Sequence, residues 1–287
     1  MKKLFYVAAS LLLLTGMSLT SCTKEEEEDT NDTTKPLTVS HDPTYRMAVV
    51  EEYTGCNCGY CPQGHRIVDN LLSTNSKVLG INVHTGSLAP KYSTEFGSAL
   101  YAQTGGTGVP SGTVNRHAFS SSNTTLNPGY FSSYVSQITS QRSCVNLAAR
   151  ATIDRNSRVL TVDVAGYYTG NSASSTNKLN VVLVQNNVIG TQRNFGTPLY
   201  YAENYIDSTN LDTYRHQHML RHMLTGQWGE TISPTTQGSS FNKTYTYTLP
   251  TIIGDLAPVP ENMEVIVFMA EGQQEIITGV KASMSLK

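Results

Sequence analysis

The segment Cys56-Asn57-Cys58-Gly59-Tyr60-Cys61-Pro62 constrains the fold and the chemistry of this chain more than any other feature. An apolar run precedes it, and apolar residues at helical spacing follow it, so the pattern predicts a strand, a tight turn and a helix over residues 62–73. A helix N-terminus stabilises a thiolate, because its unpaired N–H groups and its macrodipole attract negative charge. The pattern therefore predicts a redox pair, with Cys58 as an exposed nucleophile and Cys61 as the resolving thiol.

A second turn supports this interpretation. Residues 104–111, Thr-Gly-Gly-Thr-Gly-Val-Pro-Ser, form a glycine-rich loop that leads into a predicted strand at residues 112–115. Peptide bonds that precede proline are the ones that adopt the cis form in tight turns. With Cys58 and Cys61 at the positions of its active-site pair and Val109-Pro110 at its cis-proline loop, the chain resembles the thioredoxin superfamily.

This resemblance implies roles for the residues around the cysteines. Glu52 lies six residues before Cys58, where the superfamily usually has a buried carboxylate, commonly aspartate, that takes a proton from the resolving thiol. The backbone beside Val109 and Pro110 is implied to align a substrate chain by strand-like pairing. The implied activity is thiol–disulfide exchange, in which Cys58 attacks the substrate and Cys61 resolves the mixed disulfide.

A narrower resemblance rests on the sequence around the motif. The residues Glu51-Glu52-Tyr53-Thr54-Gly55 before the cysteines, the Cys-Pro pair after them and a β-rich C-terminal half resemble the Bacteroidetes lipoproteins related to the outer membrane protein of twenty-eight kilodaltons. The similarity covers the whole mature chain, and its least generic segments are residues 51–64 and 214–230. It implies a location at the outer membrane and a thioredoxin-like N-terminal domain, and it leaves the activity open.

The N-terminus has the features of a lipoprotein signal peptide. Lys2 and Lys3 precede an apolar stretch at residues 4–17, and Leu19-Thr20-Ser21-Cys22 matches a lipobox. The apolar stretch is shorter than the ~20 residues of a transmembrane helix, so cleavage after residue 21 is expected. Cys22 then becomes the acylated first residue. Several acyl chains at this cysteine, palmitate among them, anchor a protein stably, whereas a single chain gives only marginal binding.

Residues 22–42 are predicted to form a lipidated, acidic and disordered tether. Residues 23–42 contain two lysines and seven acidic residues, which account for most of the net charge of the mature chain. Lys24 followed by the acidic run at residues 25–29 resembles the signal with which Bacteroidetes export lipoproteins to the cell surface. The alternative is a solvated spacer on a periplasm-facing anchor. The remaining chain is near neutral, and no basic patch predicts nucleic acid binding.

Residues 43–142 are predicted to form an α/β thioredoxin-like domain. The expected strands and helices alternate: strands at residues 45–53, 78–84 and 112–115, and helices at residues 62–73, 93–103 and 130–141. This alternation predicts a mixed sheet with helices on both faces.

Residues 143–287 are predicted to form an all-β antiparallel sandwich domain. Alternating apolar residues predict strands at residues 146–153, 159–164, 179–184, 245–249, 265–269 and 276–284. Two separate cores are therefore expected, one in each domain. The segment at residues 191–210, rich in tyrosine and asparagine, is too long for a hairpin turn, and loops of this length are commonly functional or disordered.

The cysteines allow several interpretations. In an oxidising, exported setting Cys58 and Cys61 form either a redox pair or a static disulfide. Cys56, Cys58, Cys61 and His65 also have the residue types of a structural zinc site, but a Cys58–Cys61 disulfide offers no thiolates, so no metal is predicted. Cys56 and Cys144 then remain to form a structural disulfide with each other, or to stay as two buried thiols.

A histidine cluster is the other candidate for metal binding. His216 and His218 share a face in a strand, whereas His218 and His222 share a face in a helix, so no single conformation gathers all three. The interleaved apolar residues favour an ordinary element that borders the core. Trp228 and the tyrosines of residues 200–205 could stack on sugars, although packing is the more common role of such side chains.

Two functions from different classes follow from these features. The first is a thiol–disulfide oxidoreductase that acts on the thiols or disulfides of exported proteins, uses no cofactor and is held at the outer membrane by its lipid. The second is a non-catalytic surface lipoprotein that binds protein or glycan through the loops of its β-sandwich. The joint presence of the cysteine turn and the Val109-Pro110 loop favours the oxidoreductase. The absence of an obvious electron donor at the outer leaflet favours the binding protein.

Overall fold

The structure, a computed structural model, describes residues 36–120 and 122–287. The predicted signal peptide, Cys22 and the part of the predicted tether before residue 36 lie outside the described residues. Among the described residues, no helix is both long enough and apolar enough to cross a membrane.

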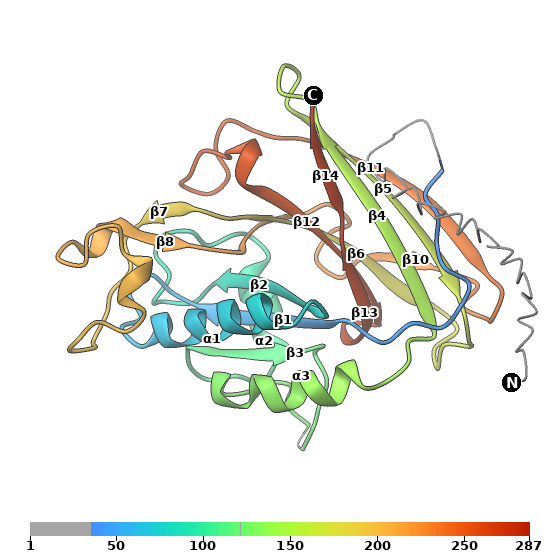
Figure 1. Ribbon diagram of the computed structural model, residues 1–287, viewed down its shortest axis with the longest axis horizontal. Helices are drawn as coiled ribbons and strands as arrows, with labels where there is room; N and C mark the ends of the chain where they lie inside the picture. Colours follow the sequence, from blue (N-terminus) through green and yellow to red (C-terminus); the bar gives the residue numbers. More distant parts are fainter. Residues whose placement is uncertain (1–35, 121) are drawn as a thin grey trace, which may run out of the picture.

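The first half of the described chain alternates strands and helices (Figure 1). Its elements are β1 (Ala48–Thr54), α1 (Cys61–Thr74), β2 (Val78–His84), α2 (Gly97–Ala102), β3 (Ser111–Val114) and α3 (Phe131–Thr139). β1 pairs in parallel with β2 and antiparallel with β3. Val68 of α1 and Phe131 of α3 pack against one face of this sheet, and Leu100 of α2 packs against the other. The structure thus has the predicted mixed sheet with helices on both faces.

The second half is almost entirely β-structure. Its strands are β4 (Val145–Ile153), β5 (Val159–Tyr168), β6 (Asn177–Gln185), β7 (Val188–Gly190), β8 (Tyr214–His216), β9 (Met219–Met223), β10 (Glu230–Ile232), β11 (Ser240–Thr248), β12 (Met263–Glu271), β13 (Gln274–Lys281) and β14 (Ser283–Leu286). The predicted strands are present with ends that differ by a few residues, except that the strand expected at residues 276–284 is broken at Ala282 into β13 and β14, which belong to different sheets. Only short 3-10 helices interrupt the strands in this part of the described chain.

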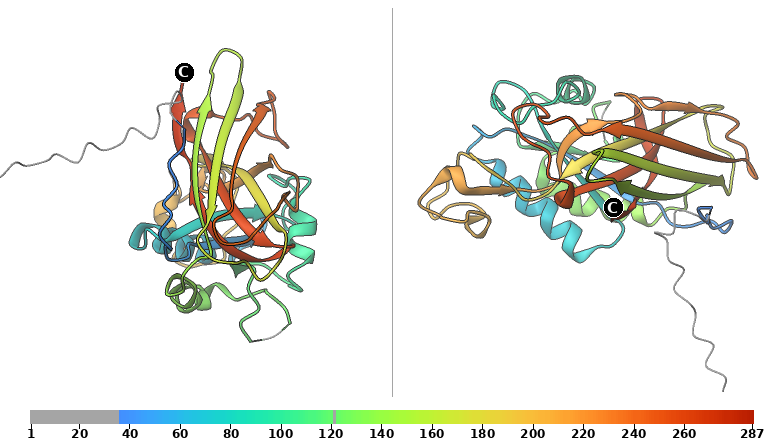
Figure 2. Two further views of the ribbon diagram at one scale, coloured as in Figure 1. Left: turned by 90° about the vertical axis from the view of Figure 1, so that its right-hand side faces the viewer. Right: turned by 90° about the horizontal axis from the view of Figure 1, so that it is seen from above.

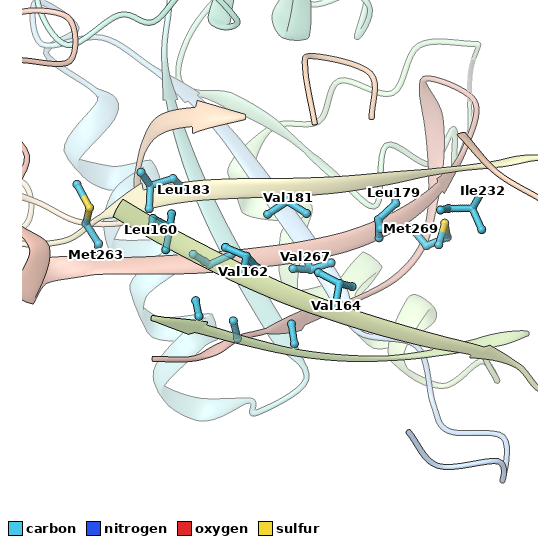
Figure 3. Packing of buried hydrophobic residues seen from close by; sticks show 14 of the residues in the cluster. Leu160, Val162, Val164, Leu179, Val181, Leu183, Ile232, Met263, Val267 and Met269 are labelled. Carbon is cyan, nitrogen blue, oxygen red and sulfur yellow. The ribbon is translucent and has the colours of Figure 1, made fainter. Parts of the chain in front are cut away.

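Two sheets face one another in this half and form the predicted sandwich. A four-stranded sheet in the order β11-β5-β4-β14 packs over β6 and β12. Figure 3 shows side chains of β5, such as Val162, lying against side chains of β6 and β12, such as Val181 and Val267. These three side chains are fully buried, because alternate residues of each strand point into the space between the sheets. The pairing is antiparallel throughout this sheet except for β14, which runs parallel to β4.

The expectation of two separate cores divided near residue 142 is wrong. Strands of both halves form one eight-stranded sheet in the order β13-β12-β6-β9-β2-β1-β3, with β10 paired to β6. One buried cluster contains Val49 and Ile81 from the first half together with Val182 and Phe268 from the second. The physical reason is that β9 pairs with both β2 and β6, and this pairing satisfies the backbone groups at the edge of β2 that would otherwise be exposed.

The large sheet curls until its far strand, β13, lies beside the start of β1 and the end of β3 (Figure 2). The amide of Ile276 donates a hydrogen bond to the carbonyl of Asn115 at 2.8 Å. The amide of Met47 donates to the hydroxyl of Thr278 at 3.0 Å. The buried cluster that the two halves share lies on the inner face of this curled sheet, together with Leu100 of α2. The helix α1 and the four-stranded sheet pack on the outer face.

Candidate functional site

The two cysteines of the Cys-x-x-Cys motif form a disulfide at the start of α1. Their Cα atoms are 5.4 Å apart. The amide of Cys58 donates to the carbonyl of Gly55 at 2.9 Å, which closes the turn after β1. Cys61 is the first residue of α1 and Pro62 lies in its first turn, where the missing N–H of proline has no cost. A thiolate released at this position would lie at the positive end of the helix.

The expectation that Cys58 is exposed is wrong, because only 3% of its surface is accessible. The segment that follows β7 covers the turn. Gln192 is fully buried, and its Nε2 donates to the carbonyl of Cys58 at 2.9 Å. The amide of Arg193 donates to the carbonyl of Cys56 at 2.8 Å, and the amide of Phe195 donates to the carbonyl of Gly59 at 3.0 Å. We call residues 191–201 the covering segment.

Aromatic side chains form the outer edge of this cover. The rings of Tyr60 and Phe195 meet edge to face with their centres 5.3 Å apart, and the ring centre of Tyr200 lies 6.2 Å from that of Tyr60. Tyr60 is 53% exposed and Phe195 is 56% exposed. The covered disulfide is therefore bordered by large apolar groups that a polypeptide could contact without any movement of the chain.

The loop before β3 lies against the disulfide. The Val109-Pro110 peptide bond is cis, and the carbonyl oxygen of Val109 lies 3.6 Å from the sulfur of Cys58. Both loop residues are half-buried, so part of this backbone is open to solvent. The structure thus brings together two motifs that lie about 50 residues apart in the sequence, at a distance that one bound peptide can span.

Glu52 is fully buried on the face of β1 that α1 covers. Neither of its carboxyl oxygens has a hydrogen-bond partner among the described residues. Burial, with a smaller contribution from Asp69, raises the pKa of Glu52 well above its ordinary value. A side chain at position 64 would collide with Glu52 Oε1, so the carboxyl group lies directly against the backbone of Gly64. Because Cys61 precedes Gly64 by three residues, both lie on the same face of α1.

His65 forms hydrogen bonds through both of its ring nitrogens. One ring nitrogen is 2.7 Å from the hydroxyl of Thr54, and the other is 2.7 Å from the hydroxyl of Tyr214. Burial, with a smaller contribution from His216, lowers the pKa of His65 to about 3, so the ring is neutral. His65 therefore connects α1 to β1 and β8 as an uncharged hydrogen-bonding group.

The three histidines of the second cluster point to different places. His216 is buried beside His84 and Tyr92. His218 lies between two carboxylates, 3.6 Å from Asp69 and 3.9 Å from Glu264. His222 stacks on Tyr247 with ring centres 4.1 Å apart. In the part of the chain that the structure describes, no group of three or more histidine, cysteine or acidic side chains is arranged to hold a metal ion.

The remaining cysteines do not form a disulfide with each other, so of the two alternatives the structure has separate thiols. Cys56 and Cys144 are both free thiols. Cys56 is buried against Tyr92 and Val188 near the covering segment, whereas Cys144 packs at the edge of the sandwich core. The two cysteines belong to separate hydrophobic clusters, which is the physical reason that they do not pair.

Sequence reasoning missed the residues that hold the site together. Asp69 accepts a hydrogen bond from the hydroxyl of Tyr201 at 2.5 Å, and this bond fixes the end of the covering segment to α1. Asp69 follows His65 by four residues, so its place on the buried face of α1 was visible in the helical spacing. Gln192 and Tyr214 had no such signal, because each reaches the site from a part of the chain that is distant in sequence.

Comparison with known proteins gives a family. Residues 97–285 match the family described as outer membrane protein Omp28. The chain belongs to the Omp28 family. The protein is therefore placed at the outer membrane. No curated protein shows significant similarity to this Omp28-family chain.

Solved structures of two other proteins share the fold of this Omp28-family protein. HBP35 of Porphyromonas gingivalis superposes with a TM-score of 0.65 and 17% identity, over 84% of this chain and 76% of that one. The protein AGR_C_4864 from Agrobacterium tumefaciens gives a TM-score of 0.50 and 11% identity, over 83% and 95%. A domain of the outer membrane lipoprotein Omp28 from Porphyromonas gingivalis is also matched, over 50% of this chain and 91% of that one, at 17% identity and a TM-score of 0.32, and this match does not bear on the fold. At these identities the first two likenesses show a common fold only.

Proposed function

We propose that this protein is a thiol–disulfide oxidoreductase at the outer membrane that acts on the cysteines of exported proteins. The observation that carries the proposal is the contact between the Val109 carbonyl and the sulfur of Cys58, 3.6 Å apart, at the positive end of α1. A substrate strand that pairs with the backbone beside Val109 would bring its own sulfur to Cys58. Glu52, buried beside the helix turn that carries Cys61, supplies a group that can exchange a proton there.

The first step starts from the oxidised pair seen in the structure. A substrate thiolate attacks Cys58 Sγ, the Cys58–Cys61 bond breaks, and a mixed disulfide forms. Cys61 leaves as a thiolate and takes a proton from Glu52, whose raised pKa favours its protonated form. A second substrate thiolate then attacks the substrate sulfur of the mixed disulfide and releases Cys58. The substrate dithiol becomes a disulfide and the pair gains two electrons, with Cys61 holding the proton from Glu52 and Cys58 released as a thiolate at the positive end of α1.

The reverse sequence reduces a substrate disulfide and regenerates the oxidised pair. Here Glu52 takes the proton from Cys61 before Cys61 attacks the mixed disulfide. Turnover requires both partners, a dithiol to reduce the pair and a disulfide to oxidise it. Either direction also requires the covering segment to move, because Cys58 is almost fully buried beneath it.

A second function is favoured by that same burial. A disulfide held under the hydrogen bonds of Gln192 and Phe195 can act as a static brace between β1 and α1. The protein would then be a non-catalytic surface protein that binds protein or glycan, with the aromatic edge at Tyr60 and Phe195 as a contact surface. In both versions Cys22 carries the lipid that anchors the chain.

The reduction potential of the Cys58–Cys61 pair separates the two functions. A redox pair is expected to have a potential above about −300 mV and to catalyse insulin reduction in the presence of dithiothreitol. Cys58→Ser should abolish catalysis, and Cys61→Ser should accumulate mixed disulfides with substrate. Cys144→Ser is the matched control, because it removes a cysteine at the sandwich edge and should leave catalysis unchanged. A potential below about −300 mV, with equal activity in the unaltered chain and in Cys58→Ser, would assign the static role.

A further inference from the structure

A groove of about 850 Å³ lies on the outer face of the large sheet, between α1 and the four-stranded sheet. Its walls come from the end of α1, from β2, β12 and β13, and from the chain at residues 38–47 that leads into β1. The apolar side chains that line it include Leu72, Val78, Leu147 and Val280. The volume lies within the range of known small-molecule binding sites.

The groove exists because α1 and the four-stranded sheet both pack on the outer face of the large sheet and leave a space between them. Leu72 lies at the edge of the cluster beneath α1, whereas Leu147 and Val280 lie at the edge of the sandwich cluster. Met47 lies at the edge of the cluster inside the curled sheet. All four side chains are only partly buried, so apolar surface from three hydrophobic clusters is exposed to solvent along the groove.

Two positively charged side chains, Lys77 and Arg142, lie at the rim of this groove. Lys77 Nζ lies 4.3 Å, and the guanidinium carbon of Arg142 lies 4.0 Å, from the centre of the same ring, that of Tyr45. Neither side chain forms an ion pair with a carboxylate among residues 36–120 and 122–287. The other lysine of the groove, Lys281, is paired with Glu264 at 3.1 Å. The guanidinium of Arg142 also donates to the carbonyl of Pro43 at 2.8 Å. The groove therefore combines apolar walls with two cations at one end that have no carboxylate partner among the described residues.

We propose that this groove binds the acyl chain of a long-chain carboxylate, such as a free fatty acid. The carboxylate would lie at the rim beside Lys77 and Arg142, where these cations can donate charge-assisted hydrogen bonds. The acyl chain would lie along Met47, Leu72 and Val280 and remove their exposed surface from water. A neutral lipid would leave the two cations unpaired, so the site selects for a negatively charged head group.

This site is separate from the cysteine turn. The turn lies at the N-terminus of α1, whereas Leu72 lies near the C-terminal end of the helix, roughly 15 Å further along its axis at 1.5 Å per residue. The proposed ligand site therefore does not depend on the proposed redox function.

Calorimetric titration with sodium palmitate tests the proposal. The full chain carries Cys22→Ser, so that no acyl group of its own competes for the groove. We expect one palmitate per chain with a micromolar Kd. Lys77→Gln combined with Arg142→Gln should weaken binding at least tenfold, because the exposed rim contributes the charge and little of the fold. Lys91→Gln combined with Arg66→Gln removes the same charge from exposed positions outside the groove and should leave the Kd unchanged.

A second variant tests the apolar wall. Val280→Trp should fill the groove and abolish binding of palmitate while the chain keeps its circular dichroism spectrum. The proposal is overturned if palmitate does not saturate a single site, or if the variant that lacks both rim cations binds as tightly as the unaltered chain. It is also overturned if palmitate does not bind and Val280→Trp converts a dimer to a monomer, since the groove would then hold a second copy of the chain.

Discussion

The amide of Phe195 donates a hydrogen bond to the carbonyl of Gly59, the residue directly after Cys58, with a length of 3.0 Å. The Phe195 ring also occupies the position that a side chain at residue 59 would need. Gly59 therefore permits the covering segment to lie flat on the cysteine turn. The Gly59-Tyr60 dipeptide therefore sets the spacing of the two cysteines and also forms the surface on which the covering segment packs.

Phe195→Ala should make the Cys58–Cys61 disulfide more reactive. The ring is 56% exposed, so its removal should cost little stability, yet it shields the turn at Gly59. We expect the rate of reduction by dithiothreitol to rise about threefold or more, measured by thiol release in stopped flow. Tyr130→Ala, which removes another exposed aromatic ring, is the control and should leave the rate unchanged. Equal rates in all three proteins would show that the ring does not shield the disulfide.

Glu52→Gln should slow the proton-coupled step at Cys61. In the reducing direction Glu52 acts as a base, so the rate at which Cys61 resolves a mixed disulfide should rise with pH through the raised pKa of Glu52. In Glu52→Gln this pH dependence should disappear, and the rate near neutral pH should fall about 100-fold, in the usual range for a lost acid–base group. Rapid-quench kinetics between pH 6 and 9 measure both effects.

The stability of the same variant provides an independent check. A carboxyl group whose pKa is raised by folding stabilises the fold at low pH and loses that contribution as the pH rises above its ordinary value. Glu52→Gln should therefore be more resistant to urea than the unaltered chain at pH 8 and differ little from it at pH 4. A variant with altered stability but an unchanged kinetic pH profile would make Glu52 a structural residue only.

Local sequence patterns predicted the elements well where one face of the chain is fully apolar. The continuous apolar run at Val78–His84 gave β2 with its observed ends, and the helical spacing after Pro62 gave α1 within one residue at each end. α2 is shorter than predicted, since only residues 97–102 of the expected 93–103 are helical. The placement of the Val109-Pro110 loop beside the cysteine turn agrees with what the resemblance to the thioredoxin superfamily implied, rather than with a local pattern.

Contacts between distant parts of the chain could not be predicted from local patterns. Gln192 Nε2 contacts the carbonyl of Cys58 across 134 residues, and no property of either residue indicates this contact. The joining of both halves into one sheet depends on β9, which pairs with β2 through a single register position, Asn82 with Met219. The residues of β9 fit a strand or a helix equally well, so their partner was not visible in the sequence.

Arg116→Met should destabilise the fold strongly. The guanidinium of Arg116 makes two hydrogen bonds to the carboxylate of Glu51, at 2.6 and 2.7 Å, and both side chains are almost fully buried. Removal of the cation leaves a buried, uncompensated carboxylate, which typically costs about 3–5 kcal/mol of unfolding free energy. Urea unfolding measures the loss.

A double variant provides the control for that change. Arg116→Met combined with Glu51→Leu removes both charges and should recover a large part of the lost stability. Arg66→Met, at an exposed position on α1, should change the unfolding free energy by less than about 0.5 kcal/mol. If the double variant were no more stable than Arg116→Met, the ion pair would not be the source of the effect.

The acidic run after Cys22 should direct the protein to the outer surface. Proteinase added to intact cells is expected to degrade the unaltered protein, and replacement of residues 25–29 by alanine should leave it protected. Cys22→Ser should release the protein from the membrane fraction altogether, because the anchor is lost. Protection of the unaltered protein would place it on the periplasmic face and would remove the objection that no electron donor is near.

His216→Phe should make the fold less sensitive to acid. Burial lowers the pKa of His216 to about 4, since its ring lies among His84, Tyr92 and Tyr214, whereas an unfolded histidine has a pKa near 6.5. Between these values the unfolded chain binds a proton that the folded chain does not, so the unfolding free energy falls by about 1.4 kcal/mol per pH unit as the pH decreases. Urea unfolding from pH 7 to pH 4.5 should show a slope smaller by about that amount in His216→Phe, while Tyr130→Phe, at an exposed position, keeps the slope of the unaltered chain. Parallel curves for all three proteins would mean that His216 is protonated equally in the folded and unfolded states, contrary to its burial.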